Sequence, residues 1–420
     1  MIVPGHSGRI RIRSNFAAFQ RDAVEIPCAH WAPRDARWLP TPRLSLPAPG
    51  VTSLPARLIT QDSFGRLLHY DVLGLTYWML SRREEVGAQA LDLHQRFPAE
   101  SSHAWRHGYL ERPIVDEWFE VLRRLIQAVW PSLPVRETRY TVSLSHDVDT
   151  PARYALMGLP RLARSMCADL MRRRDVKTLL QAPSIWARSA QRIDSRDPYN
   201  TFDWIMARSE AVGLRSAFYF ICGQTDRRRD GSYTPEHPAI IDLMRRIHDR
   251  GHEIGLHPSY HCYRDPRALV REAERLRSIC EQAGIATSSM GARMHYLRWE
   301  TPTTLHGLEA AGLRYDTTLG YALQPGFRCG TCHEYTAFDP VENRPLQLRI
   351  RPLIVMESTV VRRAYPDGMA GAERHVEALM EACRRVNGRF TLLWHNTLLE
   401  HAQHRRLYER VLGHYLKGRK

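Results

Sequence analysis

The chain has 420 residues, a formal net charge of +15 and 25% charged residues. This length allows one large domain with a smaller one, or two to three domains of average size. The positive charge comes almost entirely from arginine, because the only lysines are Lys177, Lys417 and Lys420. The arginines are spread among acidic residues, with no basic run interleaved with aromatics, which argues against nucleic-acid binding. A basic surface would still attract phosphorylated or lipid-linked sugars, or a membrane face.

The cysteines and the N-terminus exclude several further classes. The eight cysteines are scattered, which does not fit a small domain held together by disulfides. Cys329 and Cys332 form a single CxxC without the second pair of a zinc site, so we interpret it as incidental. No charged region followed by an apolar one opens the chain, and no apolar run approaches the ~20 residues of a membrane span. We therefore expect a cytoplasmic protein, or one peripheral to the inner membrane.

The first part of the chain shows no obvious chemistry. Residues 1–60 are rich in proline and predict short strands and extended loops. Residues 71–82 have apolar positions at helical spacing, and residues 112–127 form an amphipathic pattern that ends before Pro131. We predict that residues 1–135 form an accessory domain of unknown role.

Strands and helices are predicted to alternate from residue 140 onward. Strands are expected at 140–144, 216–222, 253–257, 290–296, 314–319 and 390–394, with one or two more over 346–356. Helices are expected between and after them, at 155–192, 202–212, 237–250, 266–283, 301–311, 372–386 and 401–415. Such alternation indicates parallel strands joined by right-handed crossovers. We predict an α/β fold in which residues 136–420 form a distorted (β/α) barrel of about seven units, with its chemistry at the carboxyl ends of the strands.

The first of these strands ends in two carboxylates, within the stretch TVSLSHDVDT. Because strand side chains alternate between faces, Asp147 and Asp149 point one way while His146 and Val148 point the other. Two carboxylates on one face repel each other unless a cation offsets their charge. A divalent metal on one, with the other free as a base, would resolve this. On their own, the two residues could equally be turn and helix-cap residues.

Polar side chains also follow the later strands. His257 precedes Pro258 and should stay extended, while a short helical turn could bring His261 back beside it, at a spacing common for metal ligands. The following predicted strands are succeeded by further polar or aromatic residues: Arg293, His295, Arg298 and Trp299 after one, Asp316 after the next and His395 after the last.

These residue types suit hydrolysis at a metal. Two histidines and one aspartate, with one position open, form a catalytic rather than a structural metal site, and zinc suits this set. A separate carboxylate can take a proton from water, and a histidine can protonate the leaving group. An arginine can keep the base ionised, and an aspartate can orient the acid. This scheme uses Asp147, Arg293, Asp316 and His395.

The motifs at these strand ends resemble those of the polysaccharide deacetylases, the NodB-homology carbohydrate esterases. Five motifs occur in the order of that family: SHDVD, HPSYH, RMHY, YDTTLG and LLWH. Over residues 70–400 the chain also resembles a bacterial subgroup in which a helical N-terminal region precedes the deacetylase domain. The sequence departs from the common family text in having Val148 between the two aspartates and His295 where proline is usual.

The resemblance implies a role for each matching residue. It implies metal ligands at Asp149, His257 and His261. It implies catalytic roles for Asp147 as base, Arg293 in support of the base, His395 as acid and Asp316 in orienting that acid. The two aspartates could exchange roles. His146 could be an extra ligand, although strand alternation favours a role in packing or support.

Residues near the later motifs would form the walls of a sugar site. We expect His295, Tyr296, Arg298 and Trp299 to bind substrate, and Arg328 to contact an anionic group from a loop over the pocket; Arg298 could also be a solvated loop residue. The expected function is removal of acetyl from an N-acetylated sugar of a surface polysaccharide or glycoconjugate, with a divalent metal. The alternatives are an O-acetyl esterase, a non-sugar amidase or a non-catalytic sugar-binding protein.

Overall fold

The structure is a computed structural model that describes residues 1–4, 7–20, 25–32, 38, 45–172, 176–287 and 289–418. Its largest element is a nine-stranded sheet. The order of its strands is β11-β12-β10-β9-β8-β7-β6-β14-β13. Their bounds are β6 Thr141–Val148, β7 Ser216–Phe220, β8 Glu253–Leu256, β9 Gly291–Ala292, β10 Tyr315–Asp316, β11 Tyr335–Asp339, β12 Arg344–Ile350, β13 Val355–Met356 and β14 Arg389–Leu393.

The strands wind as the alternation of strands and helices predicts. All neighbouring strands are parallel except β11 and β12. From β6 to β10 the spatial order follows the chain, and β14 returns to the free side of β6. In the part of the chain that the structure describes, β11 and β13 are the two ends of the sheet, so it is open rather than closed. The expected mixed α/β architecture is confirmed, with a barrel-like winding.

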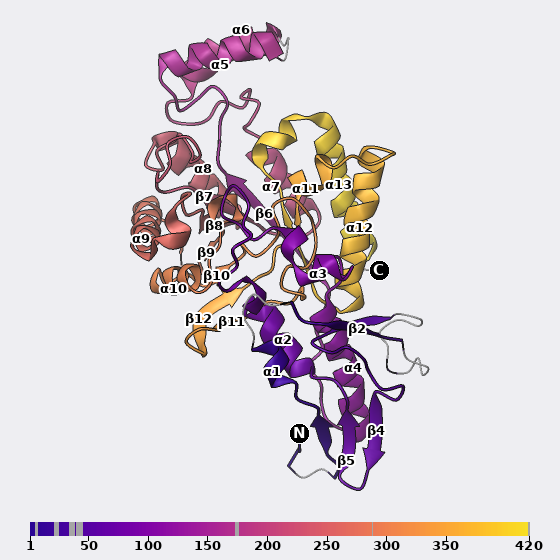
Figure 1. The fold of residues 1–420 in the computed structure, drawn as a ribbon. Helices are drawn as coiled ribbons and strands as arrows, with labels where there is room; N and C mark the ends of the chain where they lie inside the picture. The colour runs from indigo at the N-terminus through magenta and orange to yellow at the C-terminus, as the bar shows by residue number, and fades with distance from the viewer. Residues whose placement is uncertain are drawn as a thin grey trace.

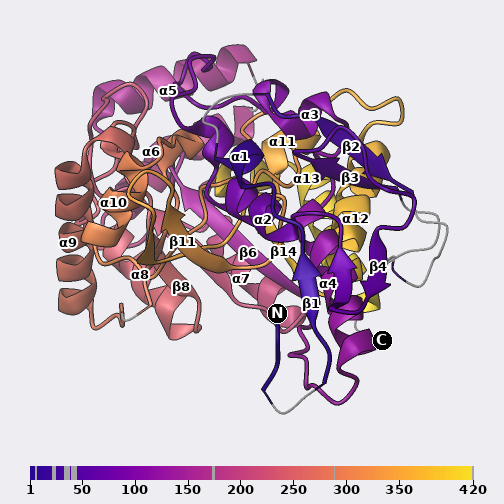
Figure 2. The same ribbon diagram turned by 60° about the horizontal axis from the view of Figure 1, so that its bottom comes forward.

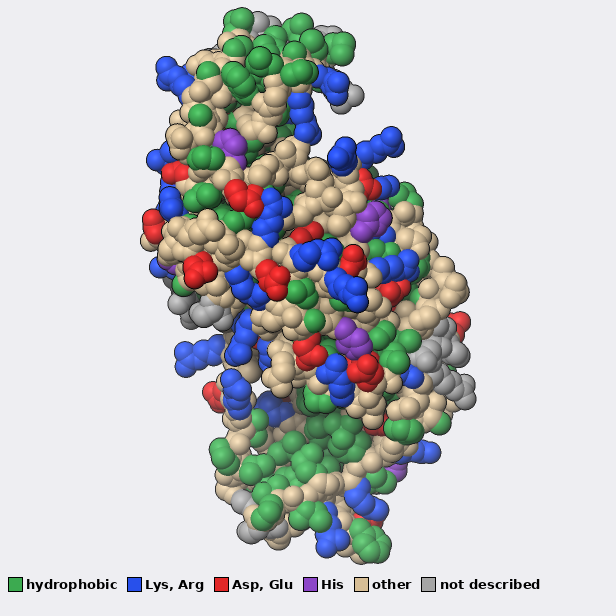
Figure 3. All heavy atoms as spheres, turned by 90° about the vertical axis from the view of Figure 1, so that its left-hand side faces the viewer, with side chains coloured by type: hydrophobic (Ala, Val, Ile, Leu, Met, Phe, Trp, Pro, Cys, Tyr) green, Lys and Arg blue, Asp and Glu red, His purple; other side chains and the backbone are tan. Residues whose placement is uncertain are grey.

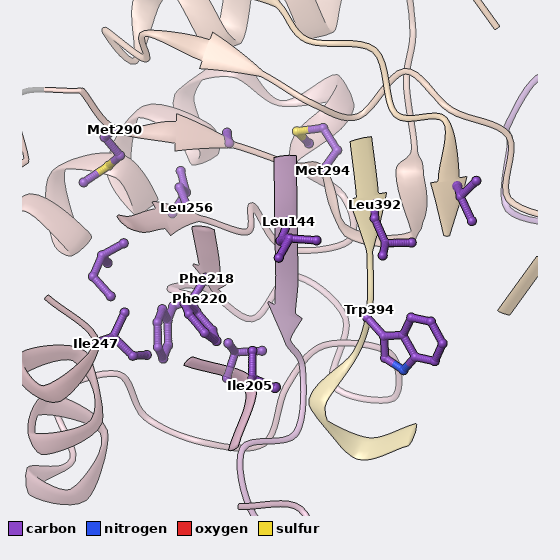
Figure 4. Packing of buried hydrophobic residues seen from close by; sticks show 14 of the residues in the cluster. Leu144, Ile205, Phe218, Phe220, Ile247, Leu256, Met290, Met294, Leu392 and Trp394 are labelled. Carbon is purple, nitrogen blue, oxygen red and sulfur yellow. The ribbon is translucent and has the colours of Figure 1, made fainter. Parts of the chain in front are cut away.

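Helices cover the outer side of this sheet (Figures 1 and 2). Their bounds are α7 Phe202–Ala211, α8 Pro238–Asp249, α9 Pro266–Ala283, α10 Thr303–Ala310, α11 Glu357–Val361, α12 Met369–Arg385 and α13 Ala402–Lys417. The side chains between the sheet and these helices form one large hydrophobic cluster, which includes Leu144, Phe218, Leu256 and Leu392 (Figure 4). Burial of this apolar surface fixes β6 and its neighbours, and therefore the strand ends.

The inner side of the sheet is filled by aromatic rings. Tyr219 on β7 and Tyr315 on β10 are buried there, and their hydroxyls are 2.9 Å apart. Glycines on the intervening strands provide the space, since a Cβ on Gly255 would lie 2.4 Å from the Tyr219 ring and one on Gly291 would lie 2.1 Å from the Tyr315 ring. The two glycines therefore allow bulky rings to support the floor of the site.

Two strands are shorter than the sequence predicts. Strands were expected over 290–296 and 314–319, whereas β9 and β10 have two residues each. After β9 the chain turns at Tyr296, with φ 61°, and at Leu297, with φ 56°. Pairing of β9 with β8 stops at Ala292, and the left-handed turn that follows redirects the chain.

The N-terminal region has a hydrophobic cluster of its own, centred on Trp78 and Trp118. Tyr321, from the later part of the chain, also enters this cluster. The region contains a three-stranded sheet, a two-stranded sheet and helices. Their bounds are β1 Ile10–Ile12, β2 Cys28–Trp31, β3 Leu46–Pro49, β4 Ile59–Asp62, β5 Gly65–Leu68, α1 Phe16–Phe19, α2 Val72–Leu80, α3 His103–Arg106 and α4 Ile114–Val129.

Two further helices, α5 (Leu159–Arg172) and α6 (Val176–Arg188), pair with each other and project away from the sheet (Figure 1). They follow β6 and precede α7. Among the described residues, no helix combines the length and apolar character needed to cross a bilayer.

Arg328 joins the N-terminal region to the barrel-like part. Its guanidinium is buried, bonds both carboxylate oxygens of Glu85 at 2.9 and 2.7 Å, and donates to Gly320 O. Arg82 donates to the Arg328 carbonyl and to Glu85. The expectation that Arg328 contacts an anionic substrate is therefore wrong, because its donors are taken up in this buried network.

Replacing Arg328 with alanine is expected to destabilise the protein by about 3–5 kcal/mol, since it leaves Glu85 charged, buried and short of a partner. Chemical denaturation would measure the change. The double variant Arg328→Met/Glu85→Leu removes both charges and should recover much of the loss. Equal instability of the two variants would show that the ion pair is not the cause.

Candidate active site

A pocket of about 600 Å³ opens at the carboxyl ends of the central parallel strands. Its lining includes Asp147 on β6, Asp149 just after β6, His257 after β8, His295 after β9 and His395 after β14. The polar residues at the ends of these strands therefore meet in one place, as expected for a parallel sheet.

Three of these residues form a cluster with metal-ligand spacing. Asp149, His257 and His295 each offer one ligand atom, and the three atoms lie within 4.8 Å of one another. Oδ1 of Asp149 is 3.2 Å from Nε2 of His257 and 3.6 Å from Nε2 of His295. The same Oδ1 atom is buried and has no hydrogen-bond partner. A buried carboxylate oxygen in this state is costly unless a cation binds it.

The two imidazoles of this cluster are fixed by their other nitrogens. Nδ1 of His257 donates to the Arg293 carbonyl at 2.5 Å, and Nδ1 of His295 donates to Asp230 Oδ1 at 3.0 Å. Each ring therefore points its Nε2 atom toward Asp149, the orientation of metal-binding histidines, in which Nε2 binds the cation after losing its proton. Asp230 was not foreseen from the sequence, where it lies in a loop without a recognisable motif.

The pKa values of Asp149 and His257 are each shifted toward the charged form by neighbouring groups of the site. Burial alone would raise the pKa of Asp149, but the surrounding imidazoles hold it well below its usual range. Burial alone would lower the pKa of His257, but the carboxylates of Asp147 and Asp149 raise it. Asp149 is therefore ionised, as a metal ligand must be.

His261 lies outside this cluster, contrary to the expectation that it would fold back beside His257. Its side chain is 54% exposed, and its Nε2 is 3.9 Å from Asp226. The segment does turn, since the Cys262 backbone N–H bonds the Ser259 carbonyl, but the Ser259 and Tyr260 backbone N–H groups are held by the carboxylates of Glu272 and Asp230. These two bonds hold the segment in a path that directs His261 toward solvent.

Arg293 holds Asp147 in place, as the sequence predicts. Its Nη1 donates to Asp147 Oδ1 at 2.8 Å, while Nη2 donates to Ser145 Oγ and Nε to the Thr317 carbonyl. The guanidinium also lies over the Tyr219 ring, 4.9 Å from its centroid. Oδ2 of Asp147 is 3.7 Å from Nε2 of His257, so this carboxylate adjoins the cluster without being part of it.

His395 is oriented by Glu357 rather than by Asp316. Nδ1 of His395 lies 2.6 Å from Glu357 Oε1, and Nε2 lies 3.5 Å from Asp149 Oδ2. Burial alone would lower the pKa of His395, but the Glu357 carboxylate raises it to about 10. Asp316 instead accepts from the backbone N–H and hydroxyl of Thr318. The predicted contact between Asp316 and His395 is therefore wrong.

Glu357 was not predicted from the sequence, because it belongs to none of the five motifs. Glu357 is the residue directly after β13, which pairs with β14, the strand that precedes His395. A carboxylate directly after a predicted strand was the available signal.

Burial raises the pKa of Asp316 to about 7, which fits a structural residue enclosed at the end of β10.

Two of the predicted substrate-binding residues are instead packed inside the protein. Arg298 lies between the rings of Tyr260 and Tyr263, at 3.9 and 3.8 Å from their centroids, and donates to the His94 carbonyl. Trp299 is buried and donates to Thr301. Neither lines the pocket. These two expectations are wrong, because the turn after β9 carries both residues into the packing beneath the pocket wall.

The other two predicted wall residues, His295 and Tyr296, do line the pocket. His146, in contrast, faces away from it, with Nδ1 bonded to the Trp394 carbonyl at 2.7 Å and the ring stacked on Phe218. Burial lowers the pKa of His146 to about 3, so the ring is neutral and serves packing.

Five arginines line the same pocket: Arg96, Arg161, Arg228, Arg229 and Arg362. Arg96 is paired with Asp92, and Arg229 is paired with Asp226. The other three are exposed and have no ion-pair partner among the residues that the structure describes. The pocket therefore combines a deep acidic and histidine-rich floor with a cationic mouth.

Comparison with known proteins gives one family model and several solved structures that match the chain. Residues 6–131 match a family of unknown function (DUF7033). No protein in a search of curated sequences matches the chain.

Solved structures that match include a protein described as a polysaccharide deacetylase from Mycobacterium smegmatis, with 17% identity and a TM-score of 0.42, covering 68% of this chain and 87% of that one. They also include Puue allantoinase, with 12% identity and a TM-score of 0.37, covering 69% and 89%. A protein described as a polysaccharide deacetylase from Pseudomonas aeruginosa PAO1 has 11% identity and a TM-score of 0.36, covering 66% and 84%. Polysaccharide deacetylases are thus among the structures that this chain matches, but at these scores none of them assigns an activity to it.

Proposed function

We propose that this chain is a metal-dependent hydrolase that removes acetyl groups from N-acetylated sugars of a surface polysaccharide or glycoconjugate. The observation that carries the proposal is the fixed pair of imidazoles, His257 and His295, whose Nε2 atoms face the unpartnered Asp149 oxygen. An acid–base pair of residues, Asp147 and His395, adjoins this cluster. Binding of a sugar alone would require neither the cluster nor the pair.

The residues fit a divalent cation held by Asp149, His257 and His295. Two histidine nitrogens and one carboxylate oxygen are a donor set that zinc favours, and both histidines have the supporting acceptors typical of such sites. A cation held there supplies the Lewis acidity that activates water for attack on an amide. We propose this set in place of the one with His261, whose side chain points to solvent.

The chain's own residues would move the protons. Arg293 holds the Asp147 carboxylate in place by donating to its Oδ1, and this carboxylate would accept a proton from the attacking water. Glu357 keeps His395 protonated at neutral pH, so that its Nε2–H can pass a proton to the departing amine. Both groups lie beside Asp149. Asp147 is two residues before it on the same face of the chain, and Nε2 of His395 is 3.5 Å from Asp149 Oδ2.

Removal of the metal tests this function directly. Incubation with a zinc chelator is expected to reduce acetate release from N-acetylated chitooligosaccharides to background, and added zinc should restore it. Acetate is measured by a coupled assay, with far-ultraviolet circular dichroism to confirm that the protein stays folded. Full turnover by protein shown to contain no metal would overturn the proposal.

The substrate is proposed to carry an anionic group. Arg228 and Arg362 line the pocket and are exposed, without an ion-pair partner in the described part of the chain. Each can make a charge-assisted hydrogen bond to a phosphate or carboxylate outside the reacting centre. A lipid-linked sugar phosphate and an acidic polysaccharide both have this chemistry.

We expect Arg228→Ala and Arg362→Ala each to raise KM about tenfold for an anionic acetylated sugar while leaving kcat near that of the wild type, as loss of one charge-assisted hydrogen bond predicts. Steady-state acetate release would measure both constants. Arg267→Ala, which removes an exposed arginine of α9 that does not line the pocket, is the matched control. An equal rise in KM for a neutral acetylated sugar would contradict recognition of charge.

The same site could cleave an O-acetyl ester or an amide that is not part of a sugar. A panel of N-acetyl sugars, O-acetyl sugars and simple amides, compared by acetate release per enzyme, would separate these activities.

The two separate hydrophobic clusters support a division of the chain near residue 135 into an accessory domain and a catalytic domain.

A further inference from the structure

The paired helices α5 and α6 present apolar side chains to solvent. On α5, Leu159 is 62% exposed, Leu170 52% and Met171 77%. Together with the exposed Ala163 and Cys167, these residues follow one face of the helix at i, i+4, i+8, i+11 and i+12. An exposed apolar stripe of this kind marks an interaction surface.

The opposite face of α5 is packed against other parts of the protein. Leu162 packs with Ala182 and Ile185 of α6 and with Tyr154, which anchors the helix pair to the segment after β6. The helix therefore has a buried apolar face and, in addition, an exposed apolar face. On α6, Leu180 is 76% exposed and adds to the apolar surface of the pair.

Within the described residues of α5 and α6, the exposed charges have one sign. Arg161 and Arg164 on α5 and Arg188 on α6 are exposed. Asp169 is the only acidic residue within the bounds of the two helices, and it is buried in a pair with Arg153. Figure 3 shows the apolar side chains gathered at the end of the molecule where α5 and α6 lie, with basic side chains beside them. An amphipathic surface with only positive charge complements an anionic lipid surface.

The surface is also close to the site. Arg161, in the first turn of α5, lines the pocket that holds Asp149 and the histidine cluster. A bilayer that binds α5 would therefore lie at the mouth of the pocket. A soluble oligosaccharide has no need of such a surface, whereas a substrate anchored in a membrane would be delivered to the pocket along it.

We propose that the paired helices α5 and α6 form a membrane-docking element that binds the surface of an anionic lipid bilayer and places the mouth of the pocket there. The apolar stripe enters the boundary between headgroups and acyl chains, and the flanking arginines bind lipid phosphates. The inference goes beyond the proposed hydrolase activity, because binding to lipid is measured without substrate or turnover.

Flotation of the full-length protein with vesicles tests the proposal. We expect binding to vesicles of phosphatidylcholine with about one third phosphatidylglycerol, and about 10²-fold weaker binding to phosphatidylcholine alone, because the three exposed arginines then lose their anionic partners. Leu170→Glu/Met171→Glu and Arg161→Glu/Arg164→Glu should each weaken binding at least about tenfold. Val341→Glu and Arg267→Glu, at exposed positions far from α5 in the chain, should bind as the wild type does.

A fluorescent label reports insertion even if a charge variant folds poorly. Cys167 is the exposed cysteine and lies on the apolar stripe, so an environment-sensitive dye attached there should shift to the blue when anionic vesicles are added. No binding to anionic vesicles, an unshifted dye, or wild-type binding by the Leu170→Glu/Met171→Glu variant would each overturn the proposal. Self-association through α5 in sedimentation, abolished by the same variant, would also overturn it in favour of a second copy of the chain.

Discussion

Replacement of His295 by alanine is expected to remove both bound metal and activity. The imidazole supplies one of three ligand atoms that lie within 4.8 Å of one another, and Asp230 fixes its orientation. Metal affinity should fall by more than about 10²-fold, since even residues that only support a ligand contribute 10–100-fold. Zinc content per chain, measured by mass spectrometry after dialysis, and acetate release would record the two losses.

His261→Ala is the matched control, because it removes a histidine of the HPSYH motif whose side chain is 54% exposed. We expect its zinc content to equal that of the wild type and its turnover to stay within about threefold, as for other surface substitutions. The opposite pattern, with metal lost from His261→Ala and kept in His295→Ala, would contradict the ligand set and restore the one that the motif implies.

Asp147→Asn is expected to lower kcat by about 10²–10⁴ while leaving bound metal unchanged, because the amide cannot accept a proton. The amide keeps the size of the carboxylate, so the packing around Arg293 should persist. Asp149→Asn provides the contrast, since it removes the charged oxygen that faces both imidazoles. It should lose metal as well as activity.

These two variants decide how the aspartates divide their roles. Zinc content and steady-state kinetics on the same preparations would separate them, with thermal melting as a check on folding. Loss of metal from Asp147→Asn with retention in Asp149→Asn would exchange the base and the ligand. Equal behaviour of the two variants would indicate that both carboxylates bind the cation.

The fold could be predicted largely because periodicity is a local property of the chain. Alternation of strands and helices located β7, β8 and β14 to within two residues and the start of β6, which runs four residues beyond the expected end at 144, and it predicted a parallel sheet. The two-residue lengths of β9 and β10 could not be foreseen, because pairing with their neighbours stops at Ala292 and Asp316, which no local pattern encodes. Nor does periodicity show that β11 adds an antiparallel edge.

The positions of site residues could be predicted where they follow from the strand that carries the residue. Asp147 and Asp149 share a face because one residue separates them, and His257 stays at a strand end because proline follows it. Residues in turns behaved differently. The path of His261 depends on hydrogen bonds from Ser259 and Tyr260 to distant carboxylates, which no local pattern encodes.

Contacts between distant strands account for the remaining differences. Glu357 meets His395 because β13 pairs with β14, and Arg328 meets Glu85 because the N-terminal region packs against the barrel-like part. Each of these is a buried charge that needs a partner, yet the sequence alone does not say which partner it finds. Strand pairing and the packing of separate regions decide the choice.

Anomalous diffraction at the zinc edge, from crystals of the full chain grown with zinc, tests the central claim most directly. One peak is expected in the pocket, bonded to Nε2 of His257, Nε2 of His295 and a carboxylate oxygen of Asp149, at the ~2.0–2.2 Å typical of these ligands. Absence of a peak there in zinc-loaded crystals, or a peak held by His261 in place of His295, would contradict the site as described.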